Sequence, residues 1–332
     1  MRRFLLSLGL ILLGSAALFA QASSNEQTVQ FKTIQHPNSL YTDASGINRW
    51  GSIVGTYVDA DYNEHGYLLI GNNFISIDFP GAVWTDAYGI NAEGDIVGVY
   101  GDPTVDPYGS TPASMKGYLL RHGTFSTVLF PGHKGSIAER ITDDGDIYGC
   151  YHDDDLMASM HGFVRTKKGF VGLKVPDSMS NGATPDGDLI VGLYTDMATT
   201  HRHGFALRSG KFMPFDVPNS TLTAAWDINL DGDIVGNFRD SASKTHGFLL
   251  RHADFSGDNA ANNARTLGHG SGKYTPPSNN TFRGDFSTID FPAAVATQAV
   301  GINPDGDIVG AYQDASGNVF GYLRSATGES HH

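Results

Sequence analysis

One ten-residue motif recurs along the chain, and this repetition constrains the fold more than any other feature. "NPDGDIVGAY" at 303–312 has close relatives in "NAEGDIVGVY" from Asn91 and "NLDGDIVGNF" from Asn229, and a more divergent copy, "TDDGDIYGCY", from Thr142. The glycine of the turn recurs as Gly51, Gly94, Gly145, Gly187, Gly232 and Gly306. A repeat of about 45 residues indicates a ring or a stack of similar units.

Each repeat predicts four β-strands, which we name A to D in chain order. Asn-Pro-Asp-Gly (303–306) is typical of a tight A–B turn, because Asn accepts local hydrogen bonds, Pro fixes φ and Gly takes a positive φ. Segments such as "DIVGAY" and "HGFLL" are short and rich in β-branched and aromatic residues, as strands are. Four strands in about 45 residues is the size of a propeller blade.

The two ends of the chain favour a closed ring. The repeats begin with a lone D strand, "FKTIQHP" (31–37), and end with a C strand, "VFGYLR", at Arg324. Pairing the first strand with the last hides both edges, whereas a linear array would need polar caps. The sequence therefore predicts an all-β fold, a six-bladed β-propeller of four-stranded blades whose N-terminal strand completes the last blade.

The first residues are predicted to be a signal peptide. Two arginines precede an apolar run that ends in Ala20-Gln21-Ala22, a pattern typical of signal-peptidase sites. We therefore assign 1–22 to export and 23–332 to a single propeller domain, with a polar insertion at 254–284 in the C–D turn of blade 5. We expect a secreted or periplasmic monomer with no membrane span after signal cleavage.

The charge of the chain argues against one class of partner, and its cysteine count excludes internal disulfides. The formal net charge of −13 argues against nucleic acid as a partner, because phosphate binding needs a basic surface. Cys150 is the only cysteine, so the chain has no internal disulfide.

The repeat resembles a known family. Its G-I-N-x-x-G-x-I-V-G pattern, followed by His161-Gly162-Phe163, His203-Gly204-Phe205 and His246-Gly247-Phe248, is similar to the bacterial extracellular HAF-type repeats, with Gly in place of the middle Ala. Lys116 and Phe320 replace the histidine in two blades. The resemblance implies an exported β-repeat protein and brings no catalytic residue with it.

The repeated Asp and His residues are predicted to be structural. His65, His161, His203 and His246 lie one to a blade, so they are too far apart to share a metal ion, and we expect a structural Asp–His or His–backbone bond within each blade. Asp227 to Asp233 resembles the start of a calcium loop, but Phe238 stands where the loop needs Glu. We assign no metal ligand and no cofactor, and calcium is the alternative.

Three consecutive blades depart from the repeat. Strand A carries small residues in most blades, but blade 3 has Glu139 and Arg140, and blade 5 has Trp226 and Asp227. Blade 4, between them, adds "HRH" at 201–203. Asp227 is also a possible internal partner of Arg140. Because the B–C loops vary most, we expect a ligand site on their face, near the axis. The candidate ligand-binding residues are Glu139, Arg140, His152, Tyr194, His201, Arg202, Trp226 and Asp227.

Two main functions remain open. The favoured one is binding of an extracellular glycan, peptide or envelope partner on the variable-loop face, because the repeats are nearly uniform and no catalytic motif is present. The alternative is a polysaccharide lyase or hydrolase acting on acidic saccharides. In that enzyme Arg140 would neutralise a carboxylate, His152 or His201 would act as general base, and Tyr151 or Tyr194 as acid. A calcium-dependent lactonase or esterase is a weaker third possibility.

Overall fold

The structure, a computed structural model, describes residues 29–152, 160–175, 177–184, 186–196, 198–254 and 283–325. The proposed signal peptide 1–22 and nearly all of the insertion 254–284 lie outside these residues. In the described part of the chain, no helix is long and apolar enough to cross a membrane.

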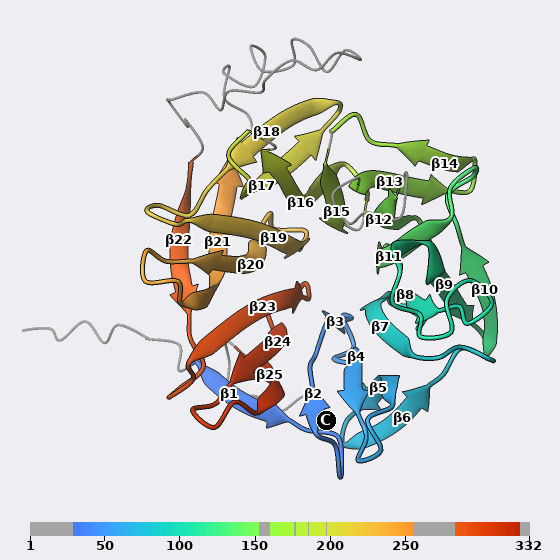
Figure 1. Cartoon of the computed structure of the whole chain (residues 1–332). Coiled ribbons are helices and arrows are strands. Elements are labelled where there is room, and N and C mark those ends of the chain that lie inside the picture. Colours follow the sequence, from blue (N-terminus) through green and yellow to red (C-terminus); the bar gives the residue numbers. More distant parts are fainter. Residues whose placement is uncertain are drawn as a thin grey trace, which may run out of the picture.

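The described strands form six antiparallel sheets around a central axis, as Figure 1 shows. Strand A of each sheet lies next to the axis, which confirms the prediction of a six-bladed β-propeller. The strands of blades 1 to 3 are β2 and β3 (Tyr41–Thr42, Gly46–Ile47), β4 (Ile53–Val58), β5 (Glu64–Ile70) and β6 (Asn73–Ile77); β7 (Thr85–Ile90), β8 (Ile96–Gly101), β9 (Met115–Arg121) and β10 (Thr124–Val128); and β11 (Gly135–Ile141), β12 (Ile147–His152), β13 (Met160–Thr166) and β14 (Gly169–Gly172). The strands of blades 4 to 6 are β15 (Ser178–Ala183), β16 (Leu189–Asp196), β17 (His201–Arg208) and β18 (Lys211–Phe215); β19 (Leu222–Ile228), β20 (Ile234–Arg239), β21 (Thr245–Asp254) and β22 (Arg283–Ile289); and β23 (Ala296–Ile302), β24 (Ile308–Gln313), β25 (Val319–Ser325) and β1 (Gln30–Ile34). One 3-10 turn, η1 (Pro112–Ser114), lies in the B–C loop of blade 2.

The ring closes between the two ends of the chain. β1 pairs antiparallel with β25, with Phe31 opposite Arg324 and Ile34 opposite Gly321. This pairing confirms the predicted closure, because β25 has a strand on each side, β24 and β1, and no exposed edge.

The repeated strand glycines make room for close packing. A Cβ on Gly66 of strand C would lie 3.2 Å from the Cβ of Ala87, in strand A of the next blade. The same contact joins Gly321 to Ala44, at 3.3 Å, across the closure of the ring. A Cβ on Gly98 of strand B would lie only 2.9 Å from the ring of Tyr118. Glycine is therefore needed wherever a neighbouring sheet or aromatic ring approaches a blade.

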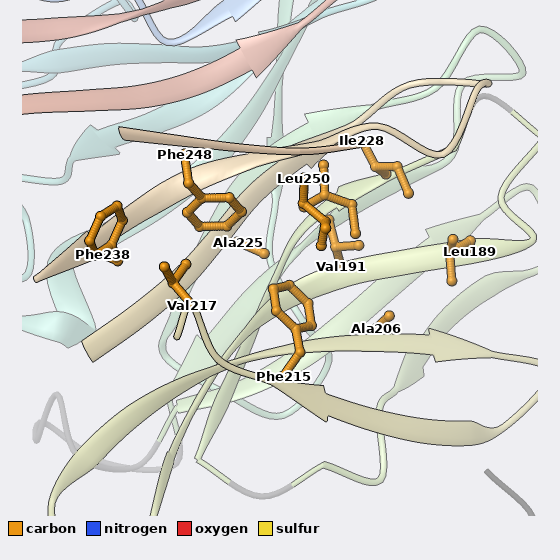
Figure 2. Packing of buried hydrophobic residues seen from close by; sticks show 11 residues of the cluster. Leu189, Val191, Ala206, Phe215, Val217, Ala225, Ile228, Phe238, Phe248 and Leu250 are labelled. Carbon is orange, nitrogen blue, oxygen red and sulfur yellow. The ribbon is translucent and has the colours of Figure 1, made fainter. Parts of the chain in front are cut away.

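Apolar side chains fill the space between neighbouring blades. Figure 2 shows the cluster between blades 4 and 5, where Phe215 and Val191 of one blade pack with Phe248 and Leu250 of the next. Burying each such side chain contributes about 1.5–3 kcal/mol. The described residues carry no disulfide, so the sheets depend on these apolar interfaces to stay together.

The histidines that begin strand C bind aspartates within their own blades. His203 Nδ1 lies 2.9 Å from Asp216, and His246 Nδ1 lies 2.9 Å from Asp290. His65 is placed between two carboxylates, 2.6 Å from Asp78 and 3.3 Å from Asp59. These contacts confirm the prediction of Asp–His bonds in these three blades.

The His203–Asp216 bond should make stability depend on pH. The hydrogen bond to Asp216 raises the pKa of His203, against the opposing effect of burial. A histidine whose pKa is higher in the folded than in the unfolded protein stabilises the fold. The stabilisation is complete below the unfolded pKa of about 6.5 and is lost as the pH rises through the pKa of the folded state. We expect His203→Gln to lower the free energy of unfolding by about 1 kcal/mol or less, and by more at pH ~5.5 than at pH ~8.5. Urea unfolding at both pH values checks this, and a cost that grows with pH would contradict it.

Candidate functional site

The innermost strands share a bulge that points residues at the axis. Strand A has a register shift at the same place in blades 2 to 6, and in blade 1 it is broken into β2 and β3. A bulge bends the strand and redirects the side chains beside it. The position that follows the bulge is Gly46, Gly89, Arg140, Gly182, Asp227 and Gly301 in blades 1 to 6. Four glycines therefore leave axial space that two charged side chains enter.

Arg140 and Asp227 meet across the axis. The Nε atom of Arg140 lies 3.5 Å from Oδ2 of Asp227, and both side chains are largely buried. This ion pair confirms the alternative in which Asp227 is the internal partner of Arg140. Asp227 also accepts hydrogen bonds from the backbone N–H of Ile228 at 3.0 Å and of Ile302 at 3.1 Å. Burial raises the pKa of Asp227, and the charge of Arg140 opposes that rise.

The remaining N–H groups of Arg140 donate to backbone carbonyls of four blades. Nη1 binds the carbonyl oxygens of Tyr88 at 2.7 Å and Glu139 at 2.9 Å. Nη2 binds those of Ser45 at 2.9 Å and Val300 at 2.6 Å. The four Nη N–H groups thus all bind backbone carbonyls, and Nε faces Asp227 at ion-pair distance without a hydrogen bond of acceptable geometry. Arg140 therefore contacts five of the six blades at the axis, and we call its guanidinium group the central brace.

Glu139 is buried next to this brace. Burial raises the pKa of its carboxyl group to about 7, although the charge of Arg140 opposes the rise. The carboxyl group acts electrostatically on Tyr88 in blade 2 and on Cys150 in its own blade. Glu139 is thus placed near the axis, as predicted, and part of it is protonated near neutral pH.

A cavity of about 80 Å³ lies on the axis among the A–B turns. Arg140 and Asp227 line its inner end. Its apolar wall consists of Ile47, Ile90, Ile141, Ile228 and Ile302, one from each blade except blade 4, which contributes Ala183. Asn48, Asn91 and Asn229 line it nearer the turns. The amide groups of Asn48 and Asn91 donate to the carbonyls of Asn91 and Thr142 in the following turns, at 3.0 and 3.1 Å, which fixes the wall.

The rim of this cavity carries an exposed tryptophan beside an ion pair. The Trp50 side chain is 70% exposed, and its indole N–H donates to the carbonyl of Ala92 at 2.9 Å. Arg49 reaches across to the carboxylate of Asp143, which also accepts from the backbone N–H of Ala92 at 2.9 Å. Sequence reasoning missed these residues, although a signal was present. The first repeat has Trp50 before the turn glycine, where the other turns have Glu or Asp.

The other candidate residues lie away from Arg140. His152 is opposite Gly135, whereas Arg140 is opposite Tyr148, four residues along the same strand and about 13 Å away. The Tyr151 ring stacks on Phe130 with centroids 4.0 Å apart, and the Tyr194 ring stacks on His203 at 5.2 Å.

His201 and Arg202 are exposed at the start of β17. Trp226, in the axial strand β19, donates its indole N–H to the Asn237 side chain. The structure therefore brings Arg140 and Asp227 together, but it does not form the Arg–His–Tyr group of the alternative enzyme. The cavity also lies at the opposite end of the axis from the B–C loops, where the sequence placed the site.

Metal binding has no preformed centre in the described ranges. There, no group of three or more His, Cys, Asp or Glu side chains is arranged to hold a metal ion.

Comparisons with known proteins agree with the propeller fold. No family model matches the chain, and no curated protein matches it. A Dyadobacter fermentans protein of unknown function is similar in structure, with a TM-score of 0.53 and 10% identity over 90% of this chain and 99% of that chain. TolB from Acinetobacter baumannii has a TM-score of 0.50 and 13% identity over 84% of this chain and 65% of that chain. The chain is thus a member of the structural class of six-bladed β-propellers.

Proposed function

We propose that this protein is an exported, non-catalytic propeller that binds a neutral saccharide at the rim of the axial cavity. The observation that carries the proposal is the exposed Trp50, held in place by Ala92 beside a polar rim. A ligand site of this kind combines an apolar platform with a few fixed polar groups. Trp50 offers a flat surface to the C–H face of a sugar ring, and Arg49 and Asp143 offer hydrogen bonds to its hydroxyl groups.

The charges of the site favour a neutral ligand over an acidic one. Arg49 is paired with Asp143, and Arg140 is paired with Asp227. Neither guanidinium is left with an unneutralised charge for a substrate carboxylate. The same pairing argues against the acidic-saccharide enzyme, which needs a free cation beside a general base.

Export is part of the proposal. Its support is the signal-like sequence at 1–22 and the resemblance to the extracellular HAF-type repeats. An extracellular glycan is the corresponding ligand.

Replacing Trp50 by alanine should weaken binding of neutral oligosaccharides by at least about tenfold, because an aromatic platform carries much of the affinity of such a site. An array of neutral and uronic-acid oligosaccharides would identify the ligand, and calorimetric titration would compare the affinities. Tyr62→Ala is the matched control, since Tyr62 is an exposed aromatic residue in the B–C loop of blade 1, at the other end of the axis. Binding that survives in Trp50→Ala, or an array that retains only acidic sugars, would refute the proposal.

A further inference from the structure

Trp50 belongs to a closed cycle of contacts that crosses three A–B turns. Its indole N–H donates to the carbonyl of Ala92 in blade 2 at 2.9 Å, and the N–H of Ala92 donates to Oδ1 of Asp143 in blade 3 at 2.9 Å. Oδ2 of Asp143 in turn accepts from Arg49, the residue before Trp50. The exposed tryptophan is thus joined along two routes to one carboxylate that lies two blades away.

A second set of bonds lies at the base of the same three turns. The side-chain amide of Asn48 donates to the carbonyl of Asn91 at 3.0 Å, and that of Asn91 donates to the carbonyl of Thr142 at 3.1 Å. Oδ1 of Asn48 also accepts from the backbone N–H of Trp50 at 3.0 Å. The turns are therefore joined at their base without Asp143, which adds bonds only at their tips.

The members of the cycle are not required by the turns themselves. Such a turn needs a side-chain acceptor at its first position and glycine at its fourth, whereas many residues fit the second and third positions. Trp50 occupies the third position of blade 1, where every other blade has Glu or Asp. In blades 1 to 6 the second position holds Arg49, Ala92, Asp143, Pro185, Leu230 and Pro304. Three residues that each occur once at these positions meet in one cycle, which indicates a role beyond building the turns.

We propose that Asp143 is a positioning residue for the saccharide platform: through Ala92 it holds the Trp50 ring in the orientation that receives a sugar. This inference rests on the proposed saccharide site. A side chain that is 70% exposed changes rotamer readily unless its polar edge is bound. Fixing the ring before the ligand arrives removes the cost of ordering it on binding. The ion pair with Arg49 keeps the Asp143 carboxylate in place for its bond to Ala92.

The indole N–H signals of the ligand-free protein test the positioning directly. The chain has three tryptophans, so three indole signals are expected in a ¹⁵N-correlated spectrum, and Trp50→Phe identifies the one from Trp50. Asp143→Ala should shift this signal and make its exchange with solvent at least about threefold faster. The Trp226 indole, which is bonded to Asn237, should be unaffected. Asp144→Ala, at an exposed carboxylate of the same turn, is the matched control and should leave the Trp50 signal unchanged.

Ala92→Pro separates positioning from direct contact with the sugar. Proline removes the N–H that Asp143 binds and keeps the carbonyl, and Pro304 occupies the same turn position in blade 6, so the turn should still form. Arg49 and Asp143 both remain available to sugar hydroxyl groups. We expect the tightest binder among cellotetraose, maltotetraose and tetra-N-acetylchitotetraose to bind this variant about three- to tenfold more weakly in calorimetric titration. Its melting curve should stay close to that of the wild type, because the base of the turns is intact.

A Trp50 indole signal that is the same in Asp143→Ala as in the wild type would overturn the proposal. An equal change in Asp144→Ala, or wild-type affinity in Ala92→Pro, would also overturn it. If none of the three saccharides binds the wild type, the saccharide proposal fails separately, and the indole signals still decide whether Asp143 holds Trp50.

Discussion

Replacing Arg140 by alanine should lower the free energy of unfolding by about 3–5 kcal/mol, the usual cost of removing one partner of a buried ion pair. The substitution leaves the Asp227 carboxylate buried without its cation. It also removes the donors for four carbonyl groups of blades 1, 2, 3 and 6. Chemical denaturation followed by circular dichroism measures the loss.

A double-mutant cycle tests the reason for this loss. Arg140→Ala with Asp227→Ala should cost less than the sum of the two single changes, because no unpaired charge then remains buried. Arg208→Ala is the control, since the Arg208–Asp188 pair is about half exposed and should contribute only about 0–1 kcal/mol. An Arg140→Ala protein as stable as the wild type would show that the guanidinium is not a structural brace.

Deleting residues 29–36, which contain β1, should lower the free energy of unfolding by at least about 4 kcal/mol, or the melting temperature by ~10 °C. The deletion removes five backbone pairings with β25 and takes buried Ile34 out of the core between blades 6 and 1. It also exposes the edge of β25 and opens the ring. Because the contacts of β1 with blade 6 and with blade 1 are lost together, we expect the unfolding transition of the whole protein to shift.

Point variants within β1 distinguish closure from a general effect of truncation. Ile34→Asp should destabilise the protein strongly, because it places a charge in the core, whereas Lys32→Asp on the exposed side of the same strand should have little effect. A truncated chain that melts like the wild type would contradict closure by β1.

The candidate site was only partly predictable. The sequence marked Arg140 and Asp227 because they replace the glycines of the other blades, and it allowed for their pairing. It did not indicate that the partners of Arg140 include Ser45 and Val300, which lie 95 and 160 residues away along the chain. It placed His152 at the B–C end of its strand, but it did not indicate that Arg140 lies opposite Tyr148, nearer the A–B turn and therefore away from His152.

The sequence by itself determined the number of blades, the four strands in each and the closure by β1. These features follow from local rules that repeat along the chain: turn glycines, alternating strand residues, and small residues where neighbouring blades touch. Only the tertiary structure decided which residues meet at the axis and at which end of it a cavity remains. The physical reason is that six blades converge there, so the environment of each axial side chain depends on residues from all of them and on closure of the ring.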